Sequence, residues 1–339
     1  MKEDNEKQHE SVTKLPAPAP AFSGTDHLQG ATLRVAVEQA IGAWLLRTPS
    51  PATRKNYRCD LDQFFKFAHI DRGCPEQLLE TRPEDVASWR ERLQDQGLAN
   101  STVARKLTVL RSLFSYLQVY GYTGANPAHS KFVTAPPVPR DGKTVGLTPK
   151  DCRRLLDAPD PSTPVGVRDR AILSTLAYSA CRVGELVQLK VGDFKTSGEH
   201  RVLALYGKGG KERTVPIHVE AVERLNAWMA ASAIAYDRGG PLFRPPLTSR
   251  GRGRDGFAAR PLSVRAVEYL VERYSKQIGL DPAVTVHSLR VTALTTARER
   301  GADIVDLQDF AGHSDPRTTL SYIRTRDRLS KSPAYVLKY

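Results

Sequence analysis

The chain has 339 residues, of which 40% are hydrophobic and 26% charged, a length and composition typical of a folded protein with two domains. Lys and Arg outnumber Asp and Glu by 50 to 37, and this net charge of +13 favours a polyanionic partner, nucleic acid ahead of an anionic membrane surface. No apolar run approaches the roughly 20 residues of a membrane span, and the N-terminus lacks the apolar core of a signal peptide. We therefore expect a soluble, cytoplasmic protein without a membrane partner.

The four cysteines are widely spaced and form no CxxC pair, which predicts neither a zinc site nor a disulfide framework. The glycine-rich turn GKGGK lacks the spacing of a nucleotide-binding P-loop and the Ser or Thr that follows it. We therefore expect no metal and no cofactor.

The charge is unevenly distributed along the chain. Residues 1–30 carry three basic and five acidic side chains (−2), residues 31–130 carry 13 and 10 (+3), and residues 131–339 carry 34 and 22 (+12). The Pro/Ala composition of residues 1–30 predicts a disordered tail. Pro136, Pro137 and Pro139 favour an extended linker over residues 131–146. This linker separates an N-terminal domain at 31–130 from a C-terminal domain at 147–335.

The N-terminal domain contains four segments with helical apolar spacing, at residues 33–46, 53–69, 83–96 and 101–120. Ser50 or Thr53, and Ser101, are candidate helix caps, while Gly97 and Gly121 are candidate helix stops. A small helical bundle is expected. Its basic side chains form either a DNA-facing surface or an ordinary solvated face, and the candidate DNA contacts are Arg54, Lys55, Arg58, Arg105 and Lys106.

The C-terminal domain reads as mainly helical with a small β-hairpin. Helices are expected at 149–156, 167–179, 219–234, 263–278, 287–300 and 304–310, and Asp315 and Pro316 begin another that carries Tyr322. Residues 201–206 and 212–217 predict two strands whose tight turn places Lys208 at its tip. The Gly-rich loop after residue 248 is either a plain surface loop or a phosphate contact through Arg250, Arg252 and Arg254.

Several side chains in this domain suit transesterification at a phosphodiester. That reaction needs a nucleophile, positive charge on the non-bridging oxygens and a proton donor for the leaving oxygen. Two arginines offer planar forks to phosphate, a lysine on a hairpin tip can deliver a proton, two histidines can move protons, and a tyrosine can attack phosphorus. Each residue alone has an ordinary structural explanation. The six candidates are Arg182, Lys208, His287, Arg290, His313 and Tyr322.

The order of these residues is informative. Arg182 lies in RVGEL, Lys208 in GKGGKER and Arg290 in HSLR, and a Gly-His pair is followed nine residues later by Tyr322. This pattern resembles the tyrosine recombinase, or phage integrase, family over roughly residues 31–330. The resemblance implies a SAM-like core-binding bundle and a catalytic domain that together form a C-shaped clamp on duplex DNA.

The resemblance also implies a mechanism and an assembly. The six candidates form the catalytic pocket, Glu185 supports it, and Tyr322 makes a 3′-phosphotyrosyl link without metal or ATP. Four protomers, identical or paired with a second recombinase, exchange strands at a specific site through a Holliday junction, for integration, excision or resolution. The segment after Tyr322 packs onto a neighbouring protomer. A simple recombinase of the Xer or transposon-resolvase kind is favoured, because no extra N-terminal DNA-binding domain is evident.

The sequence departs from the family pattern at three positions, where Val291 replaces a second His, Ala311 a common Leu and Ala180 a frequent Gly. Tyr335 and Tyr339 are rival nucleophiles, but the Gly-His spacing favours Tyr322. Two alternative functions remain, a type IB topoisomerase and a non-catalytic DNA-binding regulator. The recombinase-like bundle argues against the first, and the intact set of six residues argues against the second.

Overall fold

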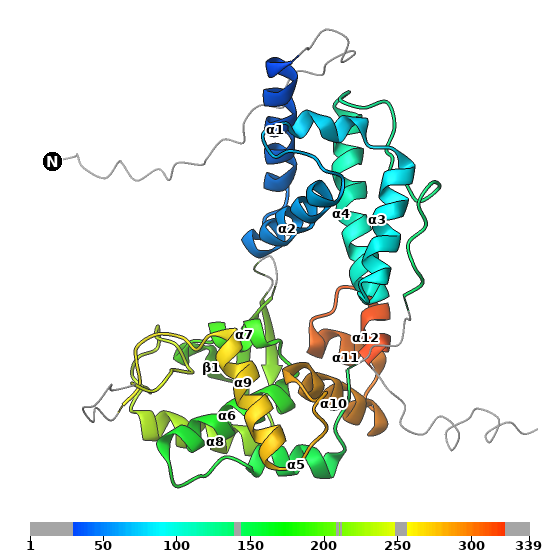
Figure 1. Ribbon diagram of the computed structural model, residues 1–339. Helices are drawn as coiled ribbons and strands as arrows, with labels where there is room; N and C mark the ends of the chain where they lie inside the picture. The colour runs from blue at the N-terminus through cyan, green and yellow to red at the C-terminus, as the bar shows by residue number, and fades with distance from the viewer. Residues whose placement is uncertain (1–29, 139–143, 208–209, 211, 248–255, 323–339) are drawn as a thin grey trace, which may run out of the picture. The chain divides into compact units, whose positions relative to one another are not determined.

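The computed structural model describes residues 30–138, 144–207, 210, 212–247 and 256–322 (Figure 1). Contacts divide the chain into two units, Met1–Pro139 and Arg140–Tyr339. Within the described residues, no helix combines the length and the apolar character needed to cross a membrane. The expected tail at 1–30 lies outside the described residues except for Gly30.

The first unit is a bundle of helices, as predicted (Figure 1). Ser50 caps the second helix by accepting a hydrogen bond from the Thr53 N–H. The prediction of Ser101 as a cap is wrong, because the carbonyl of Ala99 already accepts the first hydrogen bonds of the fourth helix and Ser101 lies inside its first turn. A short 3-10 helix, η2, was not expected. The elements are α1 (Ala31–Leu46), α2 (Pro51–Phe67), η2 (Pro75–Glu80), α3 (Pro83–Asp95) and α4 (Asn100–Val119).

The bundle core forms along the apolar face of α4, where Leu107, Leu110 and Leu113 are completely buried. Phe64 of α2 and Trp89 of α3 pack edge to face against each other, with ring centroids 5.2 Å apart. Each such side chain contributes about 1.5–3 kcal/mol when it leaves water. The regular spacing of these residues is the reason that the helices were predictable.

The segment after α4 is fixed to the first unit by side chains of the bundle. Arg111 donates to the carbonyls of Ala128 (2.8 Å) and Val133 (2.6 Å), and Asn100 donates to the carbonyl of Pro137 (2.9 Å). Val133 is only 1% exposed. Within the described part of the expected linker, up to residue 138, the carbonyls of Val133 and Pro137 are therefore held by side chains of the bundle.

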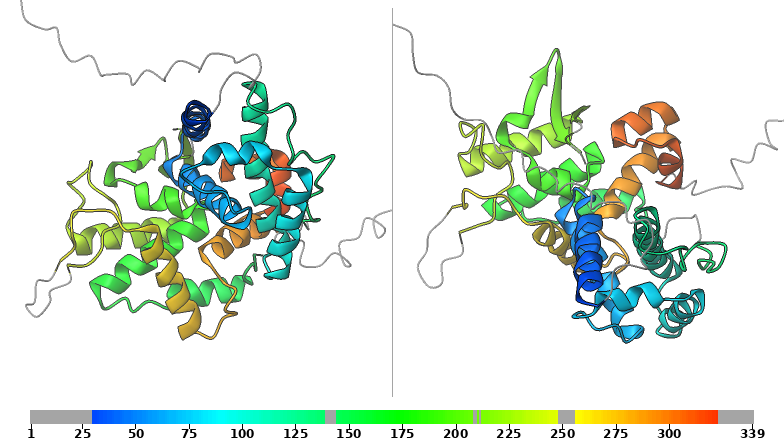
Figure 2. Two further views of the ribbon diagram at one scale, coloured as in Figure 1. Left: turned by 45° about the horizontal axis from the view of Figure 1, so that its top comes forward. Right: turned by 90° about the horizontal axis from the view of Figure 1, so that it is seen from above.

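The second unit contains helices around a three-stranded antiparallel sheet with strand order β1-β2-β3. Leu203 lies at the centre, opposite Phe194 on one side and Val215 on the other. In Figure 2 the sheet projects from the helices as a narrow ribbon. The strands and first helices are α5 (Pro149–Asp157), α6 (Pro164–Ser179), α7 (Val183–Gln188), η3 (Val191–Asp193), β1 (Phe194–Ser197), β2 (His200–Tyr206) and β3 (Glu212–Pro216). The remaining helices are α8 (Val219–Ser232), α9 (Val264–Gln277), α10 (Val286–Glu299), α11 (Ile304–Ala311) and α12 (Pro316–Tyr322).

The predicted hairpin of β2 and β3 is confirmed, and β1 is an addition to it. β1 has four residues, of which only Phe194 is buried, so its sequence carries too little alternation to be recognised. Asp315 caps the helix that it was expected to begin, because its side chain accepts the N–H of Arg317. Thr148 caps α5 in the same way by accepting the N–H of Asp151.

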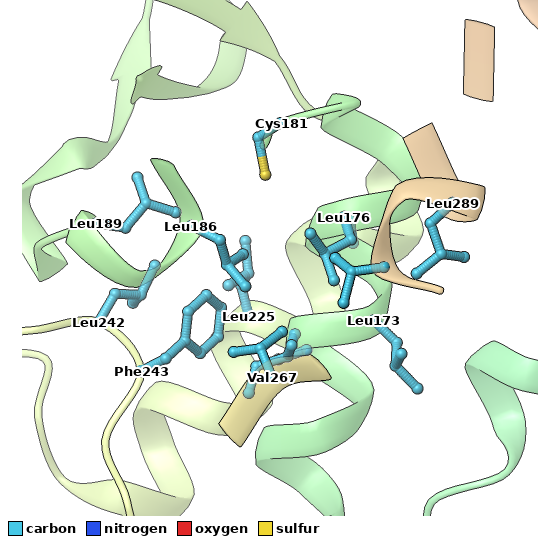
Figure 3. Close-up of a cluster of buried hydrophobic side chains, with 14 of the residues drawn as sticks. Leu173, Leu176, Cys181, Leu186, Leu189, Leu225, Leu242, Phe243, Val267 and Leu289 are labelled. Carbon is cyan, nitrogen blue, oxygen red and sulfur yellow. The ribbon is translucent and has the colours of Figure 1, made fainter. Parts of the chain in front are cut away.

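The core of the second unit surrounds α6 (Figure 3). Leu173 and Leu176 of this helix are buried with Leu186 of α7, Leu225 of α8 and Val267 of α9. A smaller cluster of buried side chains joins the end of α6 to the last three helices. It comprises Ala180, Leu294, Leu307 and Ala311, with Tyr322 packed against it. This second cluster carries the candidate site.

Candidate active site

The first component of the site is the turn between α6 and α7. Ala180 has a left-handed backbone (φ 49°) that ends α6 and turns the chain toward Arg182, the N-cap residue of α7. The Arg182 N–H donates to Oε2 of Glu185 (2.8 Å), and Nη1 of Arg182 donates to Oε1 (3.1 Å). The Arg182 side chain is still 43% exposed, so its guanidinium keeps donors available to a ligand.

Arg213 of β3 is a member of this site that the sequence analysis did not single out. Its Nη1 and Nη2 donate to Oε1 (3.0 Å) and Oε2 (2.8 Å) of Glu185, and its Nε donates to the carbonyl of Phe310 (3.3 Å). Burial raises the pKa of Glu185, but the hydrogen bonds from Arg213 and Arg182 outweigh it and hold that pKa below its usual value. A signal was present, because Arg213 alternates in step with the buried Val215 and a charge on an inward strand face needs a partner.

Arg290 of α10 is the most deeply buried arginine of the site, at 1% exposure. It donates to the carbonyl of Ala180 through Nη1, and to the carbonyl of Ala311 (2.6 Å) and Nε2 of His313 (2.8 Å) through Nη2. Its Nε has no hydrogen-bond partner among the described residues. Burial, followed by the positive charge of Arg182, lowers the pKa of Arg290 to about 10.

His313 follows the left-handed Gly312 that ends α11. Its Nδ1 lies 2.9 Å from Oγ1 of Thr319, and its Nε2 faces Arg290. Burial and the charge of Arg290 lower the pKa of His313 to about 4. His313 is therefore neutral at physiological pH.

Tyr322 ends α12 with its ring against both histidines. Its ring centroid lies 5.0 Å from that of His287 and 5.0 Å from that of His313, and Cζ of Arg290 lies 5.5 Å from the same centroid. Burial, followed by the charge of Arg290, also lowers the pKa of His287. The structure thus brings a phenol, two neutral imidazoles and a buried guanidinium into one cluster.

An open pocket of about 1000 Å³ adjoins this cluster. Arg182, Arg213 and His313 line it, together with Gly207, which immediately precedes Lys208. Lys208 itself lies outside the described residues, as do the rival nucleophiles Tyr335 and Tyr339. Arg182 and Arg213 both pair with Glu185, while no ion pair joins the buried Arg290 to a carboxylate among the described residues, so this part of the site has an excess of positive charge suited to an anion. Asp306 and Asp309 also line the pocket. No cluster of three or more His, Cys, Asp or Glu side chains in the described ranges is placed to hold a metal ion.

The candidate DNA contacts of the first unit differ in their exposure. Lys55, Arg58 and Arg105 are exposed, and Arg54 is half-buried with Nη1 donating to the carbonyl of Thr48. Lys106 corrects the expectation, because its side chain is only 5% exposed and its Nζ donates to Asp60 (2.7 Å) and Gln63 (2.6 Å). It therefore has no surface to offer DNA. The other candidates, Arg250, Arg252 and Arg254, lie outside the described residues.

Comparison with known proteins assigns both units. Residues 146–328 match the model of the Phage integrase family, and residues 44–119 match that of the Phage integrase, N-terminal SAM-like domain. The chain is 33% identical over 279 residues to tyrosine recombinase XerC of Thermodesulfovibrio yellowstonii, a match that covers 82% of this chain and 87% of that protein. It is 29% identical over 278 residues to tyrosine recombinase XerD of Listeria monocytogenes, covering 80% of this chain and 88% of that one.

Solved structures show the same fold. A lambda integrase tetramer bound to a Holliday junction matches with a TM-score of 0.65 at 19% identity, over 86% of this chain and 77% of that one. The Tn1549 transposon integrase in complex with circular intermediate DNA matches with a TM-score of 0.63 at 19% identity, over 89% and 99%. The match to the Phage integrase family and the identity to tyrosine recombinases favour neither a topoisomerase nor a non-catalytic regulator.

Proposed function

Because the chain belongs to the phage integrase family of tyrosine recombinases, and is by that membership a site-specific recombinase, we propose that Tyr322 is its nucleophile. The phenol oxygen attacks a phosphodiester of duplex DNA. A bond forms between this oxygen and phosphorus, and the bond from phosphorus to the 5′ oxygen breaks. The product is a 3′-phosphotyrosyl link and a free 5′ hydroxyl. Attack by another 5′ hydroxyl reverses the step, so the energy of the bond is kept and no ATP is consumed.

The observation that carries this proposal is the unpartnered Nε–H of Arg290 beside the Tyr322 ring. A buried donor without an acceptor costs about 1–3 kcal/mol, which a ligand oxygen at this position removes. Arginine forks match the geometry of a phosphate, and Arg182 faces the adjoining pocket with the same donors. A phosphate placed between these two arginines lies next to the tyrosine that attacks it.

The other residues have supporting roles in the proposal. The imidazole of His287 adjoins the phenol and is the base for its proton, while His313, whose Nε2 accepts from Arg290, packs against the same ring. Lys208, from the turn that begins at Gly207, delivers a proton to the leaving 5′ oxygen. Glu185 accepts a hydrogen bond from Arg182 and holds it in place without a metal ion. It takes no part in the chemical step.

We further propose the assembly that the family implies. Residues 31–130 form the core-binding domain and 147–335 the catalytic domain, and the two enclose duplex DNA as a clamp. Four protomers, identical or with a second recombinase, act on two sites through a Holliday junction in the cytoplasm, and the segment after Tyr322 contacts a neighbouring protomer. An Xer role fits the relatives, which are named XerC and XerD, and a transposon-resolvase role is the alternative. The exposed Lys55 and Arg58 contact phosphates in this proposal, whereas both terminal nitrogens of the exposed Arg105 already donate to Asp60.

The test begins by locating the DNA site. Host cells are denatured with SDS, and the DNA that remains attached to the protein is sequenced. A duplex of that sequence is then nicked just beyond the scissile phosphate, so that the short cleaved strand diffuses away and the adduct accumulates. Wild-type protein is expected to form an SDS-resistant adduct in EDTA, and Tyr322→Phe none. An adduct with Tyr322→Phe, or a requirement for metal, contradicts the mechanism.

A further inference from the structure

Thr319 belongs to none of the motifs that define the site, yet it is completely buried beside it. It lies on α12, one helical turn before Tyr322, and its hydroxyl is 2.9 Å from Nδ1 of His313. A threonine three residues before the nucleophile is on the same helical face, so both side chains of α12 point toward the same neighbours.

The direction of the hydrogen bond between His313 and Thr319 follows from the other side of the imidazole ring. A guanidinium has only donors, so the 2.8 Å contact from Nη2 of Arg290 requires Nε2 of His313 to be the acceptor. A neutral imidazole then carries its single proton on Nδ1. That proton is donated to Oγ1 of Thr319, so Arg290 sets the tautomer of His313 and the Thr319 hydroxyl holds the opposite edge of the same ring.

Thr319 is also the anchor of the helix that carries the tyrosine. α12 has only seven residues, a length at which a helix in water does not persist without tertiary contacts. Among its residues Thr319 alone is buried, while Leu320 is 52% exposed. The partner is itself fixed, because Gln308 donates to the carbonyl of His313 (3.1 Å) and the left-handed Gly312 ends α11.

We propose that Thr319 is a positioning residue that holds the helix of the nucleophile against His313 and fixes the orientation of that imidazole from the side opposite Arg290. The proposal rests on the proposed function in taking Tyr322 as the nucleophile. Removal of the hydroxyl frees both the ring proton of His313 and the start of the last turn of α12. The phenol and the imidazole then lose their fixed relation while the residues themselves remain.

The experiment compares Thr319→Val, which keeps the shape but removes the hydroxyl, with Thr319→Ser, which keeps the hydroxyl. Ser321→Ala is the matched control, because it removes an exposed hydroxyl from the same helix that bonds only within the helix. Adduct formation on the nicked duplex is expected to fall about tenfold to a hundredfold in Thr319→Val, the scale of small misplacements of reacting groups. Thr319→Ser and Ser321→Ala are expected to stay near the wild-type rate, with DNA affinity measured separately by gel shift.

A second measurement is independent of DNA. NMR of 15N-histidine-labelled protein, assigned by the signal missing from His313→Asn, reports which ring nitrogen carries the proton. We expect it on Nδ1 in both proteins, hydrogen-bonded and slow to exchange with water in the wild type, and in faster exchange in Thr319→Val because its acceptor is gone. A wild-type proton on Nε2, or a Thr319→Val rate equal to wild type, overturns the proposal. Absence of any wild-type adduct instead overturns the proposed function. The NMR measurement does not need DNA, so it still shows whether His313 donates to Thr319.

Discussion

Arg213 holds both carboxylate oxygens of Glu185, at 3.0 and 2.8 Å, and so connects the sheet to the turn that presents Arg182. The pair is buried, with side-chain exposures of 12% and 5%. Through its Nε, Arg213 also reaches the carbonyl of Phe310, close to the Gly-His pair of the site. One side chain on β3 therefore fixes two otherwise separate parts of the pocket.

We predict that Arg213→Met destabilises the second unit by about 3 kcal/mol, the lower end of the cost of leaving a buried carboxylate without its partner. Because Arg182 still pairs with Glu185 in this variant, we expect a loss of stability below the upper end of that range. Urea unfolding followed by circular dichroism measures the free energy of unfolding.

The matched control for this prediction is Arg265→Met, which breaks an exposed pair with Glu268 and should leave the stability nearly unchanged. The double variant Arg213→Met/Glu185→Gln should lose less than the two single losses added together, because the stranded charge is gone. Equal effects of Arg213→Met and Arg265→Met would refute a structural role of the Arg213 pair.

Arg290→Lys is predicted to lower the rate of adduct formation by about 100- to 1000-fold, the loss typical of removing one preorganised donor from a charge-stabilising site. A lysine has one ammonium in place of a fork and cannot reach Ala180, Ala311, His313 and a phosphate together. DNA affinity should change little, because it is spread over many phosphate contacts. Single-turnover cleavage and gel-shift assays on the same duplex separate the two effects, and parallel losses would make Arg290 a binding residue only.

The stability of the second unit should depend on pH through His313. Its pKa is 6.5 in the ordinary case and about 4 in the folded protein, so between these values the unfolded chain takes up the proton and the folded site does not. The stabilisation present above pH 6.5 is thus lost as the pH falls toward 4, by about 3 kcal/mol at about 1.36 kcal/mol per pKa unit.

Denaturant unfolding at pH 7.5 and pH 4.5 checks this effect, with His313→Asn as the comparison. The variant should show a smaller difference between the two pH values than the wild type. Some difference will remain, since burial also lowers the pKa of His287. An unchanged pH dependence in His313→Asn would rule out His313 as its source.

Two lysines of the first unit should respond differently to substitution. Lys55→Ala removes an exposed charge, and the slope of log binding constant against log salt should fall by about 1 for a lost phosphate contact. Lys106→Met should leave that slope unchanged and lower the stability, since Lys106 pairs with the buried Asp60. Fluorescence titrations over a range of salt concentrations provide the slopes. A reduced slope for Lys106→Met would show that Lys106 contacts a DNA phosphate after all.

The sequence predicts most of this architecture, because long amphipathic helices and their caps carry local signals. The position of Lys106 was also readable, since it lies three residues after Val103 and four before Leu110, on the buried stripe of α4. The basic residues beside Lys106 suggested a DNA contact, whereas its spacing from the apolar residues indicated burial. Short elements such as β1 and η2 escaped because four to six residues show too little periodicity.

The order of motifs along the sequence predicted which residues to bring together, and the structure places His287, Arg290, His313 and Tyr322 in contact. The order of motifs did not predict the contacts between other distant segments. The bond from Arg213 to Glu185 joins residues 28 positions apart, and the anchor at Thr319 depends on the direction of a histidine proton. Both are fixed by packing in three dimensions, which no local pattern encodes.

Ala180 combines a left-handed backbone with complete burial, and its carbonyl accepts the hydrogen bond from Arg290. The left-handed conformation costs an alanine roughly 1 kcal/mol relative to glycine. Its methyl group, packed in the cluster with Leu294 and Ala311, returns about 0.8 kcal/mol. These two contributions nearly cancel, so the position is close to neutral between alanine and glycine. Ala180→Gly should therefore leave the free energy of unfolding nearly unchanged, although the backbone of this residue holds the buried Arg290.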